Sequence, residues 1–289
     1  MFDRFMGYRW RTWWKGGIRV WTLAAEENIG LIAAGVAFWG MLAMFPAFAA
    51  VVAIFGLVSD PVYVAQQMEL LRGLVPEDAF KLLNDQVRTL TGAGTQTLGF
   101  ATFLSLAIAL WSSRLGTAAL IQGLNQINRQ PNRMGLRHYL TAVTLTLCLV
   151  ALAIVAIFAI VVTPIALRFL PLGAFSTNAI EVARWLLALW VLVMGISLLY
   201  RFGPNRRGQR MAWLTPGAFV TVAAWAAASA AFNLYLSNFG RYNEIYGSIG
   251  AVIALLMWLY ISAYLVLLGA ALNVTLEDTR RLQAAKADD

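Results

Sequence analysis

The chain has 289 residues, of which 60% are hydrophobic and only 12% are charged, and its formal net charge is +8 at pH 7. Soluble domains carry charge on roughly 25% of their residues, so this chain lacks about half of the polar surface that a soluble protein needs. The composition therefore excludes a soluble enzyme and a soluble DNA-binding protein.

The side chains that build metal and redox sites are almost absent. Cys148 is the only cysteine and His138 the only histidine. One cysteine forms neither an intramolecular disulfide nor a paired-cysteine metal site, and one histidine excludes histidine clusters. We therefore expect no metal site, no cofactor and no catalytic residues, so that the protein is not an enzyme.

Residues 1–28 are rich in both aromatic and basic side chains. They hold seven aromatic and five basic residues in alternation. Helices of this composition lie in the headgroup layer of a membrane. The sequence therefore predicts a cytoplasmic, interfacial amphipathic segment over 1–28. The apolar run that follows is too long for a signal peptide and is predicted to be a retained membrane span.

Six apolar runs reach the roughly 20 residues that a spanning helix needs. They cover 29–59, 97–124, 139–165, 182–200, 213–236 and 249–274. The predicted fold is all-α, a polytopic membrane protein with a six-helix transmembrane domain over 29–274 and a cytoplasmic polar tail over 275–289. Pro46 is predicted to kink the first helix. Arg114 is expected at the cytoplasmic interface or facing the bundle interior.

The loop between the first two runs is expected to be helical. Residues 61–94 place apolar side chains at helical spacing, with an interruption at Pro76. This pattern predicts two short amphipathic helices on the extracytoplasmic face. We interpret them as a cap that covers the bundle, and a substrate-gating lid is the alternative.

The distribution of lysine and arginine predicts the orientation. The two ends of the chain and the second and fourth loops hold 16 of the 22 basic residues, and the other side holds 6. Basic residues near spans concentrate on the cytoplasmic side. Both termini are therefore expected in the cytoplasm.

Two of the basic loops share the pattern P-N-R-x-G-x-R, at residues 131–137 and 204–210. A true duplication would make helices two–three and four–five parallel repeats, as in some transporters, and coincidence is the alternative. Guanidinium groups at such turns suit phosphate. The candidate lipid-headgroup residues are Arg133, Arg137, Arg206 and Arg210. The alternative is that these arginines only anchor the topology against anionic lipid.

The predicted turn between the fifth and sixth spans is rich in amides and tyrosines. Amide side chains cap helix ends and tie helices together, whereas tyrosines at a membrane boundary form an aromatic belt. We interpret the turn as a structural clamp rather than a ligand contact. Its candidate residues are Asn238, Tyr242, Asn243, Tyr246, Gly247 and Gly250. Gly247 and Gly250, with Gly269, are predicted to let the sixth helix pack closely against its neighbours.

Several motifs occur in an order that resembles one family. They are AAGVAFW at 33–39 with Phe45-Pro46, YRFGPNR at 200–206, PGA at 216–218, YGSIGA at 246–251, WLY at 258–260 and LGA at 268–270. With these motifs the chain resembles the YihY/BrkB family of bacterial inner-membrane proteins over roughly residues 20–278. The acidic residue that follows the last motif in relatives is replaced here by Ala271, so no role of that carboxylate transfers to this chain.

The resemblance implies a six-helix bundle in the bacterial inner membrane with a role in the cell envelope. Members were once labelled ribonucleases, and some relatives are linked to serum resistance or to export of lipid-type envelope precursors. The acidic residues on the predicted cytoplasmic side lie at the two ends of the chain, with no histidine among them. Hydrolysis of RNA, which needs clustered carboxylates or an acid–base pair, is therefore not expected.

Two functions remain open at this point. The first is a transporter or flippase-like protein for an anionic lipid-type envelope molecule, although the spans contain no carboxylate that could couple transport to an ion. The second is a non-transporting membrane scaffold or envelope assembly factor. The expected partners are membrane lipids with anionic headgroups and a second copy of the chain or an envelope protein. No nucleic acid partner is expected.

Overall fold

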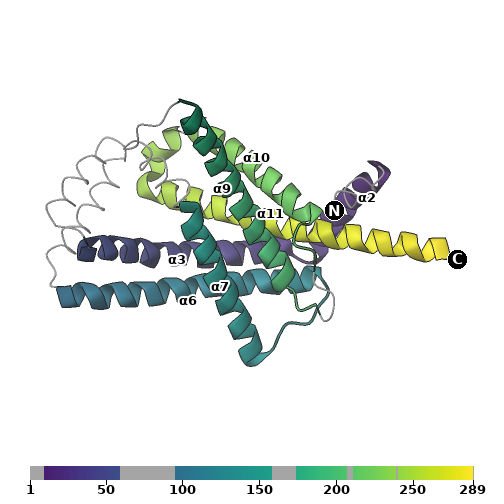
Figure 1. The fold of residues 1–289 in the computed structure, drawn as a ribbon, viewed down its shortest axis with the longest axis horizontal. Coiled ribbons are helices and arrows are strands. Elements are labelled where there is room, and N and C mark those ends of the chain that lie inside the picture. The colour runs from purple at the N-terminus through teal and green to yellow at the C-terminus, as the bar shows by residue number, and fades with distance from the viewer. Residues whose placement is uncertain (1–9, 59–94, 158–173, 207–210, 239, 289) are drawn as a thin grey trace. The chain divides into compact units, whose positions relative to one another are not determined.

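The computed structural model describes residues 10–58, 95–157, 174–206, 211–238 and 240–288 (Figure 1). Within these ranges the chain forms seven α-helices and no strand, which confirms the all-α prediction. The helices are α2 (Trp10–Glu26), α3 (Ile29–Val58), α6 (Thr95–Ile127), α7 (Gly135–Ile157), α9 (Ala174–Phe202), α10 (Pro216–Asn238) and α11 (Gly240–Asp288).

Six of the described helices are long and apolar enough to cross a membrane. The six stretches are Ile29–Ala47, Phe103–Ile127, Gly135–Ala156, Val182–Phe202, Pro216–Leu236 and Gly250–Leu282. They coincide with the six apolar runs predicted from the sequence. Pro46 lies inside α3, which continues to Val58, and the kink expected there stays a prediction.

The apolar side chains of these helices are turned outward. Only 11% of the most apolar stretch of α10, and 33% of that of α6, is buried within the protein. Trp185, Phe103 and Leu234 are more than half exposed. Outward-facing apolar surface on helices of this length suits hydrocarbon, where the helix satisfies its own backbone groups. The protein is therefore a multi-pass membrane protein.

Local capping explains where α10 begins. The predicted run started at residue 213, but the helix starts at Pro216. The hydroxyl of Thr215 accepts a hydrogen bond from the backbone N–H of Ala218 at 3.2 Å. Thr215 is therefore the N-cap, and proline is favoured at the first helical position because its missing N–H would have no partner there.

The chain divides into two compact units, which are described separately. The first comprises Met1–Val36, Thr117–Asn238 and Trp258–Asp289. In this unit α9 contacts both α7 and α10, and the largest fully buried side chains include Tyr200, Ile29, Leu124 and Leu267. Because lipid tails are as apolar as these side chains, close van der Waals packing stabilises the helix contacts inside the bilayer.

Helix α2 belongs to the first unit and has two different faces. Leu23 and Ala24 are buried in the same core cluster as Ile29, whereas Ile18 and Trp21 are 59% and 70% exposed. Asn28, with φ of 49°, separates α2 from α3, a conformation that asparagine tolerates better than most residues. Within the segment predicted over 1–28 a helix forms over Trp10–Glu26, and its position in the headgroup layer stays a prediction.

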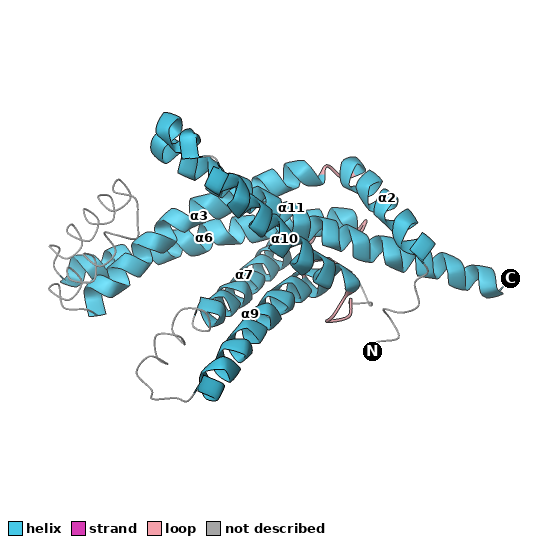
Figure 2. Cartoon of the chain, turned by 90° about the horizontal axis from the view of Figure 1, so that it is seen from above, coloured by secondary structure: helices cyan, strands magenta, loops and turns pink. Residues whose placement is uncertain are grey.

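The second unit comprises Ala37–Gly116 and Phe239–Met257. Its parts of α3 and α6 run alongside one another in both views (Figure 1 and Figure 2). Arg114 lies in the α6 span, and its guanidinium is 4.6 Å from the centroid of the Trp111 ring. The cap predicted over 61–94 lies outside the described residues.

Candidate functional site

The two loops that share the P-N-R-x-G-x-R pattern meet in the structure. The Asn205 side-chain amide donates a hydrogen bond to the Pro131 carbonyl at 3.0 Å. The backbone N–H of Asn205 donates to Asn125 Oδ1 at 2.7 Å, and Asn125 Nδ2 donates to Asn132 Oδ1 at 2.8 Å. Asn125, which is 1% exposed, therefore connects both loops.

We call this region the loop junction and define it by the end of α6 and the two loops that it joins. Its residues are Asn125, Asn128, Pro131, Asn132, Arg133, Phe202, Gly203, Pro204, Asn205 and Arg206. All of them lie in the first unit.

Arg133 binds the carbonyl groups at the end of α9. Its Nη1 donates to the Gly203 carbonyl at 2.7 Å, and its Nη2 donates to the carbonyls of Pro204 at 2.9 Å and Phe202 at 3.3 Å. The last carbonyls of a helix have no partner within the helix, and a cation there also complements the helix dipole. Burial lowers the pKa of Arg133 from its usual value, but an arginine stays charged at neutral pH. Arg133 therefore caps α9.

Arg206 links the second loop to α6 and α11. Its Nε donates to Asn128 Oδ1, and its Nη1 donates to Glu277 Oε2, both at 2.8 Å. The other oxygen of Glu277 accepts a hydrogen bond from Arg281 at 2.8 Å. Asn128 in turn donates to the Leu124 carbonyl at 2.6 Å. The Arg206 guanidinium is thus held between two helices.

The four arginines predicted for headgroup binding lie in different surroundings. Arg133 and Arg206 are half-buried and bonded to protein acceptors, whereas Arg137 is exposed in the first turn of α7. Arg210 lies outside the described residues. The structure brings the two loops together, and binding of a headgroup by the four arginines stays a prediction.

The residues predicted as a structural clamp fall at the junction of α10 and α11. Asn238 is the last residue of α10, and α11 already begins at Gly240, nine residues before the predicted run. Tyr242, Asn243, Tyr246 and Gly247 therefore lie in helix rather than in a turn, and Gly250 is buried. The positions of the Asn238, Tyr242, Asn243 and Tyr246 side chains are outside what the structure describes, so the clamp stays a prediction.

A buried polar network that the sequence did not predict joins α9, α10 and α11. The Tyr200 hydroxyl donates to the Val266 carbonyl at 2.7 Å and shares a hydrogen bond with Thr221 at 2.9 Å. Asn273 accepts from the Gly217 N–H at 2.7 Å and donates to Thr215 at 2.9 Å. Polar side chains between spanning helices stabilise their association.

Two glycines allow α10 and α11 to approach each other closely. A Cβ at Gly269 would meet the hydroxyls of Thr221 and Tyr200 and the carbonyl of Gly217, and a Cβ at Gly217 would meet the carbonyl of Gly269. Only residues without a side chain fit at such a contact. The close packing predicted at Gly269 is confirmed.

Curated relatives match the chain over most of its length. The ribonuclease-like protein YfkH of Bacillus subtilis is 27% identical over 86% of this chain and 90% of its own. A UPF0761 membrane protein of Tolumonas auensis is 26% identical over 94% of this chain and 85% of its own length. A UPF0761 membrane protein of Pseudoalteromonas translucida is 24% identical over 94% of this chain and 89% of its own length. No solved structure matches the chain.

The sequence profile of one family covers nearly the whole chain. The family is described as virulence factor BrkB, and the match extends over residues 20–289. This range includes the six described helices that could cross a membrane and the complete loop junction. The resemblance noted from the motifs is thereby confirmed, and the chain belongs to the BrkB family of membrane proteins.

Proposed function

We propose that this protein is a transporter or flippase-like protein for an anionic lipid-type envelope molecule, and that it lies in the bacterial inner membrane with both termini in the cytoplasm. The observation that carries the proposal is the loop junction, because it holds two arginine-rich loops next to each other at the ends of spanning helices. In the predicted orientation this junction faces the cytoplasm, where the headgroup of a newly made envelope lipid is first available.

The proposal gives the four arginines two different tasks. Arg133 and Arg206 already use their donors on protein acceptors, so they position the loops. Arg137, which is exposed, and Arg210 are assigned the contact with the headgroup. Arg137 lies in the first turn of α7, where the backbone N–H groups of the helix also favour an anion.

The surface of the spans supports movement of a lipid along the protein. Large side chains such as Trp185, Leu186 and Trp190 are exposed on α9, and apolar surface of this kind suits acyl chains that remain in the bilayer. Only the headgroup of the lipid would then have to cross the apolar interior of the bilayer. Such a route needs no buried ionisable group in the spans, and it makes the protein a non-enzymatic carrier.

One observation favours the alternative of a non-transporting scaffold or envelope assembly factor. The guanidinium groups of Arg133 and Arg206 are satisfied within the protein, as expected of a rigid structural unit. A scaffold would use the exposed face of α2, with Ile18 and Trp21, to bind a second copy or an envelope protein.

Reconstitution in liposomes separates the two functions. Fluorescent phosphatidylglycerol is placed in both leaflets, and dithionite quenching measures its movement. The transporter proposal predicts quenching beyond the outer leaflet in proteoliposomes and not in empty liposomes. Arg137→Gln is expected to slow the movement about tenfold to a hundredfold, since a hydrogen bond to a charged group contributes ~1.5–3 kcal/mol and 1.4 kcal/mol is a factor of ten.

The control is Arg280→Gln, which removes an exposed arginine of α11 far along the chain from both loops. It should leave the rate unchanged. Movement equal to that in empty liposomes, from protein that is folded and inserted, would contradict transport and favour the scaffold.

A further inference from the structure

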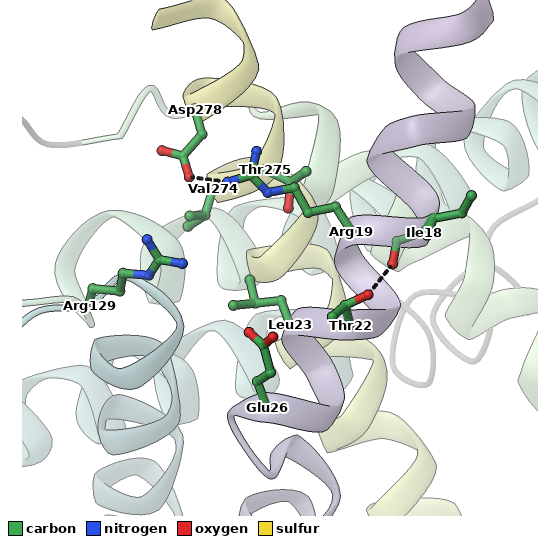
Figure 3. Close-up of a pocket in the computed structure, with 9 residues that line it drawn as sticks. All are labelled: Ile18, Arg19, Thr22, Leu23, Glu26, Arg129, Val274, Thr275 and Asp278. Carbon is green, nitrogen blue, oxygen red and sulfur yellow. Dashed lines mark hydrogen bonds and ion pairs between the residues drawn. The ribbon is translucent and has the colours of Figure 1, made fainter. Parts of the chain in front are cut away.

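A pocket of about 460 Å³ lies between α2, the end of α6 and α11 (Figure 3). None of its lining residues is a hydrogen-bond acceptor in the loop junction. Every residue that lines the pocket belongs to the first unit. The lining residues are Ile18, Arg19, Thr22, Leu23, Glu26, Arg129, Val274, Thr275 and Asp278. Its volume falls in the range of small-molecule and headgroup sites.

The charges that line the pocket balance each other. Arg19 and Asp278 form an ion pair with an N···O distance of 3.7 Å. Arg129 and Glu26 have no ion pair or side-chain hydrogen bond with any residue that the structure describes. Figure 3 shows both side chains directed toward the space between the helices. The pocket thus offers one cation and one anion that make no pair with the described residues.

A buried hydroxyl also lacks a partner. Thr275 is 2% exposed, and its Oγ1 makes no hydrogen bond within the described residues. Other threonines in the same helices donate to the carbonyl four residues earlier, as Thr279 does to Thr275 and Thr22 does to Ile18. A buried polar atom without a partner is unfavourable, so such an atom at the wall of a pocket marks a place for a ligand atom.

We propose that this pocket binds a zwitterionic phosphate ester that carries an amine, the chemistry of a phosphoethanolamine headgroup. The Arg129 guanidinium donates to two oxygens of the phosphate, and the Thr275 hydroxyl donates to the phosphate as well. The Glu26 carboxylate accepts hydrogen bonds from the ammonium group. Leu23 and Val274 provide the apolar wall against the carbon atoms between the two charges.

The charge balance also disfavours a ligand that carries a phosphate but no amine. A headgroup with a phosphate and no amine would bring an anion into a pocket with two carboxylates and would leave Glu26 unpaired. Discrimination of this kind rests on repulsion as much as on attraction. The inference goes beyond the proposed function, because binding here does not require that any lipid is moved.

Binding is measured by native mass spectrometry of the full-length protein, titrated with phosphatidylethanolamine or phosphatidylglycerol of identical acyl chains. The wild type is expected to retain phosphatidylethanolamine at least about fivefold better. Glu26→Gln should abolish this preference because the ammonium loses its acceptor, and Arg129→Gln should weaken retention of the lipid. Glu27→Gln, on the neighbouring residue that does not line the pocket, is the matched control and should behave as wild type.

Thr275→Val tests the pocket without changing its charge or shape. It is expected to weaken phosphatidylethanolamine binding severalfold and to raise the melting temperature of the lipid-free protein, because it removes a buried hydroxyl that has no partner. A structural hydroxyl would give the opposite change in melting temperature and leave lipid binding unchanged.

Soluble glycerophosphoethanolamine identifies the source of the headgroup. If it displaces the lipid, the headgroup chemistry alone is recognised, and if only the lipid binds, the site takes a membrane lipid; both results support the pocket. Equal retention of the two lipids by the wild type, or an unchanged preference in Glu26→Gln, would overturn the inference. Since these are binding measurements, their failure leaves the translocation result intact, and the reverse also holds.

Discussion

At the scale of single residues, the side-chain amide of Asn125 is the group that connects the two loops of the candidate site. It binds two loops at once, one of them 80 residues away in the chain, through hydrogen bonds of 2.7 and 2.8 Å. The partner on the second loop is the backbone N–H of Asn205, which loses this acceptor if the Asn125 side chain is removed. A buried donor without an acceptor costs more free energy than the hydrogen bond itself contributes.

We therefore predict that Asn125→Ala destabilises the protein by about 1–3 kcal/mol. The measurement is thermal unfolding of the detergent-solubilised protein, in which about 2–4 °C is lost for each kcal/mol in a chain of this size. Asn233→Ala, which replaces an exposed asparagine of α10, is the control and should unfold at the wild-type temperature. Equal melting of the two variants would show that the loops are held together by other contacts.

At the scale of elements, the contact between α10 and α11 depends on two glycines. Gly217 and Gly269 leave no room for a Cβ, and beside them Asn273 accepts a hydrogen bond from the Gly217 N–H and donates one to Thr215. This contact holds the first turn of α10, directly after the N-cap at Thr215. Thr215 in turn follows the second loop of the loop junction. Packing of the two helices and placement of the basic loop are thus coupled.

Gly269→Ala is predicted to lower the stability by about 1–3 kcal/mol or more, because overpacking forces the surrounding side chains and backbone to shift. The matched control is Gly35→Ala in α3, where a Cβ would meet no atom within 4 Å. That variant should be neutral or more stable by up to about 1 kcal/mol, the helix-propensity difference between alanine and glycine. Thermal unfolding of both variants checks the prediction, and similar losses of stability would contradict it.

The sequence predicts some of these elements better than others, for physical reasons. Lipid demands long apolar helices, so the six spans could be read from hydropathy alone. The acceptors of Arg133 are backbone carbonyls, which carry no sequence signal, and the partner of Arg206 is Glu277, 71 residues away. Such pairs depend on how the helices pack. The signals available for the junction were the pattern shared by the two loops and the asparagines that precede the first of them, Asn125 and Asn128.

At the scale of the whole molecule, orientation decides which headgroups the loop junction can meet. Six of the described helices are long and apolar enough to cross a membrane, and six spans predict that both ends of the chain lie on one side. The excess of lysine and arginine, 16 against 6, predicts that this side is the cytoplasm. The proposed function requires this orientation, because the arginines of the junction must reach lipids of the cytoplasmic leaflet.

Cysteine labelling of intact spheroplasts tests the central claim of a six-span protein with its basic loops inside. Cys148 is exposed and is first replaced by alanine. Single cysteines are then introduced at Gln67, in the loop predicted outside, and at Gln209, in the second basic loop. We expect a membrane-impermeant maleimide to label the cysteine at position 67 in intact spheroplasts, and the cysteine at position 209 only after permeabilisation. Labelling of Gln209→Cys in intact spheroplasts, with Gln67→Cys protected, would contradict it.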